Sequence, residues 1–176
     1  AGYNITTGDN NIAVGTAANY SNSTGSNNVV VGVGAVYYQS GSYNVAVGNS
    51  AIQGTGGGYT AGSYNVALGH QTLFNNTTAS YNTAVGYQAN YTNSTGQYNA
   101  IFGYTAGYSV TGSSNTYIGA RTGYSNTGEG NTFLGYTAGY SGSGNNNVCL
   151  GAQAGYSLTT GYGNTFVGSN ANVAPG

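Results

Sequence analysis

Charged residues are almost absent from this chain. Of its 176 residues only Asp9, Glu129 and Arg121 carry a formal charge, which is 2% of the chain, against about one-quarter in an ordinary soluble domain. A single arginine with no lysine cannot neutralise a run of phosphates, so nucleic-acid binding is excluded. The surface is also too weakly basic to bind an anionic membrane. Apolar runs stay far below the roughly 20 residues of a spanning helix, so no membrane insertion is expected.

Proline and cysteine are equally scarce. One Pro, 19 Tyr and 39% hydrophobic residues argue against disorder, in spite of the 33 Gly. A single cysteine, Cys149, offers no intrachain disulfide. We expect it to be buried as a small hydrophobic residue rather than to act as a reactive thiol.

The few titratable residues do not form a catalytic or metal-binding set. Asp9 and Glu129 occupy the same position of a repeat, seven repeats apart, which is about 35 Å at the spacing of β-strands. That separation is too large for joint acid–base work. His70 and Arg121 fall at turn positions. Repetitive Ca²⁺-binding rolls need an Asp in each copy, so we expect no enzyme activity, no cofactor and no metal site.

The abundant residues form a repeat. The motif "YNVAVG" recurs with its Asn at ten anchors: Asn11, Asn28, Asn44, Asn65, Asn82, Asn99, Asn115, Asn131, Asn147 and Asn164. Their spacing is 16 or 17 residues, except for one step of 21 that contains the insertion "GTGGGYT". Its "GTGGG" stretch (Gly54 to Gly58) lacks the Lys and the helix of a phosphate loop and predicts a corner loop. Gly follows every anchor by four positions and, in nine copies, precedes it by three.

Such a period predicts a β-solenoid. Recurrent Gly disfavours helix, at about 1 kcal/mol for each interior Gly, whereas triplets such as Val29–Val31 between Gly and Asn favour short strands. The sequence thus predicts an all-β fold: a β-solenoid or β-roll of about ten coils of 16–17 residues over 1–176, in a single array. Because the first residues align with the middle of a repeat, we expect a segment of a longer fibrous protein.

Each triplet offers two faces, since strand side chains alternate in direction. The third position is always apolar and is predicted to form the core ladder: Val14, Val31, Val47, Leu68, Val85, Phe102, Ile118, Leu134, Leu150 and Val167. The middle position is uncharged throughout and is predicted to pack against another chain: Ala13, Val30, Ala46, Ala67, Ala84, Ile101, Tyr117, Phe133, Cys149 and Phe166. This second column favours association with another copy of the chain; a solitary solenoid with an apolar stripe is the alternative.

Two further columns bear on glycans. Asn-x-Ser/Thr sequons, the acceptor pattern for N-glycosylation, occur at Asn4, Asn19, Asn22, Asn75, Asn76, Asn90 and Asn93. They cluster in the loop after the aromatic column, which is expected to be exposed and open to modification. An aromatic residue, mostly Tyr, stands nine positions after most anchors. This column is expected to form a ladder that packs coil on coil, with sugar stacking as the alternative role.

The units "NNIAVGTAA", "YNVAVGNSA" and "YNTAVGYQA" resemble the repeats of trimeric autotransporter adhesin heads and of phage and large-virus tail-fibre shafts. This resemblance covers Asn11 to Asn170. It implies a parallel homotrimer of β-rolls or an intertwined β-helix, in an extracellular protein of a virion or cell surface. The adhesin unit is nearer fourteen residues than the 16–17 found here.

Three functions remain open. The first is a structural or attachment fibre, a stiff uncharged shaft or head that presents or contributes to binding of a cell-surface glycan or protein receptor. The second is a self-assembling extracellular filament or sheath subunit, because unpaired strand edges promote end-to-end stacking. The third is an ice-binding β-solenoid. Against this third function, Thr recurs mainly four positions before the anchor, at a corner: Thr7, Thr24, Thr78, Thr95, Thr111, Thr127 and Thr160.

Overall fold

The computed structural model describes residues 1–54, 62–156 and 158–172, and over these residues it is all-β, with no helix. Ten three-residue strands form one parallel sheet. The strands are β1 (Ile12–Val14), β2 (Val29–Val31), β3 (Val45–Val47), β4 (Val66–Leu68), β5 (Thr83–Val85), β6 (Ala100–Phe102), β7 (Thr116–Ile118), β9 (Thr132–Leu134), β11 (Val148–Leu150) and β12 (Thr165–Val167). A two-stranded sheet joins β8 (Ser125–Asn126) to β10 (Ser141–Gly142).

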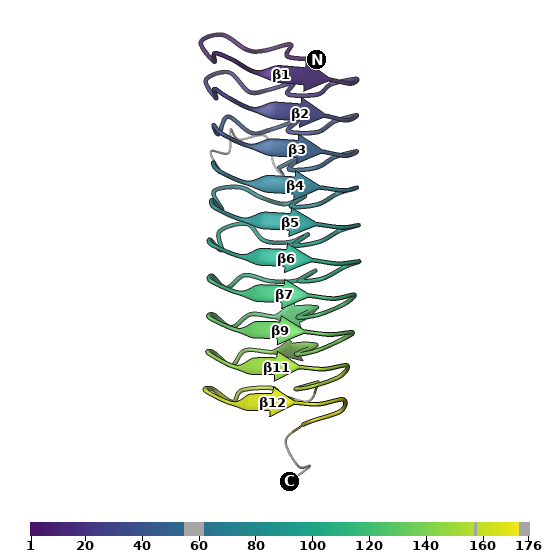
Figure 1. Cartoon of the computed structure of the whole chain (residues 1–176). Coiled ribbons are helices and arrows are strands. Elements are labelled where there is room, and N and C mark those ends of the chain that lie inside the picture. Colours follow the sequence, from purple (N-terminus) through teal and green to yellow (C-terminus); the bar gives the residue numbers. More distant parts are fainter. Residues whose placement is uncertain (55–61, 157, 173–176) are drawn as a thin grey trace.

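The sheet runs in sequence order, and every strand pairs in register with the same triplet of the next repeat. Figure 1 shows the strands stacked like the rungs of a ladder, with the two termini at opposite ends. The predicted β-solenoid is therefore confirmed, with about nine turns between the first and last strands. The insertion after Gly54 lies mostly outside the described residues.

The anchor asparagines bind each turn to the next. The Oδ1 atom of Asn82 accepts the backbone N–H of Asn99 at 2.9 Å, and its Nδ2 atom donates to the carbonyl of Gly96 at 3.0 Å. The backbone bond recurs at all nine steps between anchors. Asn82 and Asn99 are buried, so these bonds replace those that water would otherwise make.

Glycine after each strand permits the close stacking of the turns. Gly86 has a φ of 135°, in a region that residues with a Cβ rarely adopt. A Cβ at Gly86 would also overlap the carbonyl group of Gly103 in the next turn. The recurrence of Gly four positions after the anchor thus has two causes, the backbone conformation and the contact with the next turn.

The core lies inside the single chain, and two of its columns are of complementary size. Where the middle strand residue is small, as at Ala46, the residue eight after the anchor is large, as at Ile52, and both are buried. Where the middle strand residue is large, as at Tyr117, the residue eight after the anchor is glycine, as at Gly123. A Cβ at Gly123 would overlap the ring of Tyr117, so total volume is conserved from turn to turn.

The prediction of which strand face is buried was wrong. The core consists of the middle column, which had been assigned to an interface between chains: Ala13, Val30, Ala46, Ala67, Ala84, Ile101, Tyr117, Phe133, Cys149 and Phe166. The third column, predicted as core, points outward and is exposed or partly exposed: Val14, Val31, Val47, Leu68, Val85, Phe102, Ile118, Leu134, Leu150 and Val167. The reason is that the rest of each turn folds back behind the middle side chains and covers them.

Candidate interaction surface

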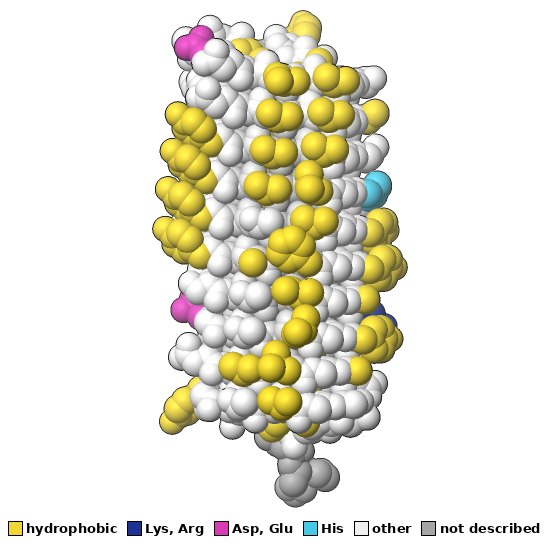
Figure 2. Space-filling view, viewed as in Figure 1, with side chains coloured by type: hydrophobic (Ala, Val, Ile, Leu, Met, Phe, Trp, Pro, Cys, Tyr) yellow, Lys and Arg dark blue, Asp and Glu magenta, His cyan; other side chains and the backbone are white. Residues whose placement is uncertain are grey.

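The outer side of the ten-stranded sheet forms a broad apolar surface, which we call the strand face. It consists of the third-position column together with the outward first position of each strand. The first-position residues are Ile12, Val29, Val45, Val66, Thr83, Ala100, Thr116, Thr132, Val148 and Thr165. Figure 2 shows the apolar members as two vertical rows at the centre of the molecule, one of which is interrupted in its middle and lower part, where Thr replaces the apolar residue. Ile118 is 42% exposed and Leu134 is 47% exposed, so large apolar side chains meet water here.

Stacked aromatic ladders border the strand face. Tyr43, Tyr64, Tyr81 and Tyr98 stand just before their anchors, with neighbouring ring centroids 4.9–5.0 Å apart. They are visible as the projecting row at one edge of Figure 2. His70, Tyr87 and Tyr104 stack just after their strands, at 5.3–5.4 Å. Rings stacked in this way gain contact with one another, but they keep an apolar, uncharged surface in water.

The aromatic column nine positions after the anchor is a continuous ladder over much of the rod, as predicted. Its longer part comprises Phe74, Tyr91, Tyr108, Tyr124, Tyr140 and Tyr156. Tyr3, Tyr20 and Tyr37 form a second part, in which neighbouring centroids lie 4.8–5.2 Å apart. Because the ring faces inside the ladder are covered by neighbouring rings, mainly the edges and hydroxyl groups remain available for a ligand.

Five of the seven sequons lie in the interior. Asn19, Asn22, Asn76, Asn90 and Asn93 are fully buried, whereas Asn4 and Asn75 are partly exposed. The buried residues lie eight or eleven positions after the anchor, where the side chain turns inward: Asn93 Oδ1, for example, accepts the backbone N–H of Gly96 at 2.7 Å. The prediction that the sequons are exposed was therefore wrong for these five. Only Asn4 and Asn75 remain as candidate acceptors.

The titratable residues are dispersed. Asp9, Glu129, His70 and Arg121 are all exposed, and the described part of the chain contains no group of three or more His, Cys, Asp or Glu residues that could hold a metal ion. Arg121 instead contacts tyrosines: its Nη2 atom donates to the hydroxyl of Tyr140 at 2.9 Å. This hydrogen bond raises the pKa of Arg121. Over the same described residues, no helix is long and apolar enough to cross a membrane.

Two buried acids make the core sensitive to alkali. Burial raises the pKa of the Cys149 thiol to about 11. Burial also raises the pKa of Tyr117, whose hydroxyl donates to Asn126 Oδ1 at 3.1 Å. Both groups are neutral in the folded protein. As the pH rises, they ionise in the unfolded chain at a lower pH than in the folded one. Stability is therefore fully present below the unfolded pKa values, about 8.5 for Cys and 10 for Tyr, and falls as the pH rises above them.

We expect the free energy of unfolding to fall by up to about 1.4 kcal/mol per pH unit for each of these groups within its window. Cys149→Ala removes the thiol at a position where Ala46, Ala67 and Ala84 already occur. The variant should lose less stability than the parent protein between pH 8 and pH 10 in urea titrations. Equal losses for the two proteins would contradict the assignment to Cys149.

Comparisons with known proteins add no family to this description. No protein-family model matches the chain, and the searches of curated proteins and of solved structures return no match. The candidate site therefore rests on the chain's own geometry.

Proposed function

We propose that this chain is a segment of a structural or attachment fibre, in which three parallel copies pack through their strand faces into a stiff, uncharged rod. The single observation that supports this proposal is the exposed strand face. Water contact with the row of Val, Leu, Ile and Phe at the third position, and with the Ile and Val of the first position, is unfavourable. An apolar surface of this kind is typical of a protein interface.

A further copy of the chain is the occupant that best fits this surface. The strand face carries no charged residue that would select an oppositely charged partner. Its rows are uneven, with the small Ala100 beside the large Phe102. In a parallel homotrimer each repeat lies beside the same repeat of the other two copies. The variation in side-chain size along the rod is then the same in all three copies, so no shift of one chain along another is needed. The resemblance to adhesin heads and tail-fibre shafts favours the same assembly.

In this proposal the rod is extracellular, on a virion or a cell surface, and presents or contributes to binding of a receptor. Its stiffness comes from the buried Asn ladder and the complementary core columns. Because the middle column is covered by its own chain, the strand face and not that column provides the proposed interface between copies.

Leu68→Lys tests this interface. Leu68 is 37% exposed on the strand face, and three lysines at one level of a trimer would repel one another. We expect the variant to have the mass of one 17.6 kDa chain and to keep its β-sheet circular dichroism. Thr78→Lys, at an exposed corner outside the strand face, is the matched control and should remain trimeric.

A trimer that survives Leu68→Lys would contradict the proposed interface. Unfolding of the variant would instead contradict the outward placement of Leu68. The two failures are distinguished by circular dichroism.

Ice binding is the second candidate, and one observation favours it. Thr83, Thr116, Thr132 and Thr165 point outward from a regular sheet, in addition to the Thr residues that the sequence places at corners. The bulky Leu68 and Phe102 interrupt the flatness that an ice surface needs, so we rank this function below the fibre. A monomer that shows thermal hysteresis would reverse the order.

A further inference from the structure

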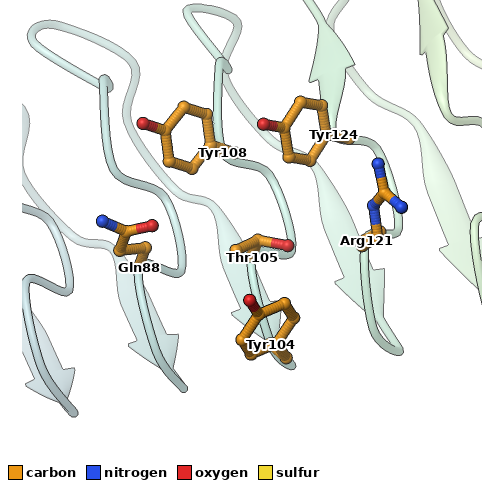
Figure 3. Close-up of a pocket in the computed structure, with 6 residues that line it drawn as sticks. All are labelled: Gln88, Tyr104, Thr105, Tyr108, Arg121 and Tyr124. Carbon is orange, nitrogen blue, oxygen red and sulfur yellow. The ribbon is translucent and has the colours of Figure 1, made fainter.

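A small polar hollow lies between two of the aromatic ladders. Six residues line it: Gln88, Tyr104, Thr105, Tyr108, Arg121 and Tyr124, around a volume of about 290 Å³ (Figure 3). Gln88, Thr105 and Arg121 occupy the same position in three successive repeats, six after the anchor. Because Thr105 is much shorter than its two neighbours, it leaves a gap between them. We call this hollow the notch.

The floor of the notch carries an unpaired hydrogen-bonding group. Thr105 is 7% exposed, and its Oγ1 atom has no hydrogen-bond partner in the structure. A buried hydroxyl without a partner costs free energy. At the equivalent position in another repeat, Thr137 Oγ1 is bonded to the carbonyl of Tyr136 at 2.8 Å. The Thr105 hydroxyl therefore has no bond within the chain, whereas the Thr137 hydroxyl does. Its oxygen is covered in this rotamer, so a bond to a ligand requires rotation of the side chain.

The two sides of the notch offer an acceptor and a cation. Gln88 donates through Nε2 to Gln71 Oε1 at 2.8 Å, and Figure 3 shows its own amide oxygen turned toward Thr105. Opposite stands Arg121, the one Lys or Arg of the chain. Its guanidinium lies 5.5 Å from the ring centroid of Tyr124 and 5.3 Å from that of Tyr140. Tyr140 uses one of its five donors and Tyr136 also interacts with the guanidinium, so a carboxylate would bind the remaining N–H groups.

An aromatic ring face completes the notch. Tyr104 stacks on Tyr87 in the preceding repeat, with centroids 5.3 Å apart. The next repeat has Ala120 at the equivalent position, so no ring covers the second face of Tyr104. The ladder is interrupted here, beside Arg121. An uncovered tyrosine face next to hydroxyl and amide groups suits a ring that is apolar on one side and polar at its edge.

We propose that the notch binds one carboxylate-bearing sugar residue, a uronic or sialic acid. Arg121 pairs with the carboxylate, Gln88 and Thr105 bond ring hydroxyls, and Tyr104 packs against the apolar face of the ring. The volume is near the lower limit of ligand pockets, about 300 Å³, so it accommodates a single ring. A lone cation without a glycine-rich nest is a weak phosphate site, which makes a sugar acid the better match.

This proposal does not depend on the trimer. The notch is built from one chain, and none of its six residues belongs to the strand face. The notch adds a specific receptor class to the fibre proposal, but the trimer and the notch can be disproved independently of each other. A monomer that binds the sugar acid overturns only the trimer, and a trimer that does not bind it overturns only the notch.

The single arginine makes binding directly observable, since its side chain gives one Nε–Hε signal in a ¹⁵N spectrum of the intact protein. We expect glucuronate and N-acetylneuraminate to shift this signal saturably in the millimolar range, and the stronger of the two to identify the sugar-acid class. Glucose, acetate and inorganic phosphate serve as comparison ligands and should bind at least tenfold more weakly.

Thr105→Gln tests the notch itself by filling it. Glutamine already stands at this position in Gln71 and Gln88, with φ of 52° and 51° against 48° for Thr105, so the backbone accepts the change. We expect at least a tenfold loss of glucuronate affinity. Ser50→Gln, the corresponding change at the same position of an earlier repeat, is the control and should bind as the parent does.

Several results would overturn the proposal. The first is the absence of any saturable shift with either sugar acid. The second is equal binding of acetate or phosphate, which would indicate simple ion pairing with Arg121. The third is unchanged glucuronate affinity in Thr105→Gln.

Discussion

Ala67→Asp is expected to unfold the solenoid around β4, with a loss of about 4 kcal/mol or more in the free energy of unfolding. Ala67 is fully buried, and its side chain points into the core between Ala46 and Ala84 of the adjacent strands. An aspartate here would bury a charge that has no cationic partner within the core. Urea denaturation followed by circular dichroism measures the loss.

Leu68→Asp is the matched control, since the same acidic residue is placed one position further along the same strand. Leu68 points outward and is 37% exposed in the single chain, so its charge reaches water once the copies separate, and the separate chain keeps a cooperative unfolding transition. If Leu68→Asp destabilised the single chain as much as Ala67→Asp, the assignment of the inner and outer faces would be wrong.

Asn82→Ala is expected to cost about 3 kcal/mol. The change leaves the backbone N–H of the buried Asn99 without its side-chain partner. It also removes one of the two donors to the carbonyl of Gly96, the other being Asn93 Nδ2 at 3.0 Å. Each unsatisfied buried group costs about 1–3 kcal/mol, and a small cavity adds to the loss. The midpoint of urea denaturation measures the effect.

Asn49→Ala provides the comparison for this second prediction. Asn49 is exposed, and its side chain accepts a hydrogen bond only from the neighbouring Ser50 hydroxyl, at 3.1 Å. Its replacement should change stability by less than about 0.5 kcal/mol, as is usual at the surface. Similar effects at Asn82 and Asn49 would show that the buried Asn ladder does not hold the turns together.

The sequence predicted the repeat and the positions of the strands. These features depend on spacing and on glycine and asparagine chemistry, both of which can be read directly. The inner face of the strands could not be chosen in the same way, because each triplet is uncharged on both sides. The alternation of side-chain direction assigns each strand residue to one of two faces, but it does not show which face the rest of the turn covers.

One pattern in the sequence does identify the inner face. The middle strand position and the position eight after the anchor vary in opposite directions, as in Ala46 with Ile52 and Tyr117 with Gly123. Such compensation is expected only when two side chains share one enclosed space. The same pattern places Asn19 and Asn90 inside, because they occupy the second of these positions, and so accounts for buried sequons.

The notch was beyond prediction for a different reason. Gln88, Thr105 and Arg121 are visible in one column of the repeat, but the hollow depends on the difference in length between them. It also depends on the missing ring at Ala120, in a ladder whose geometry only the structure supplies. Local departures from a repeat are therefore the places where a binding site on this rod is best sought.

The measurement that tests the central proposal most directly is the native mass of the unmodified protein, by sedimentation equilibrium over a dilution series. The account predicts about three times the 17.6 kDa of one chain, stable on dilution because the strand faces are covered. A single-chain mass at all concentrations would contradict the fibre assembly, and an open-ended series of masses would favour a filament instead.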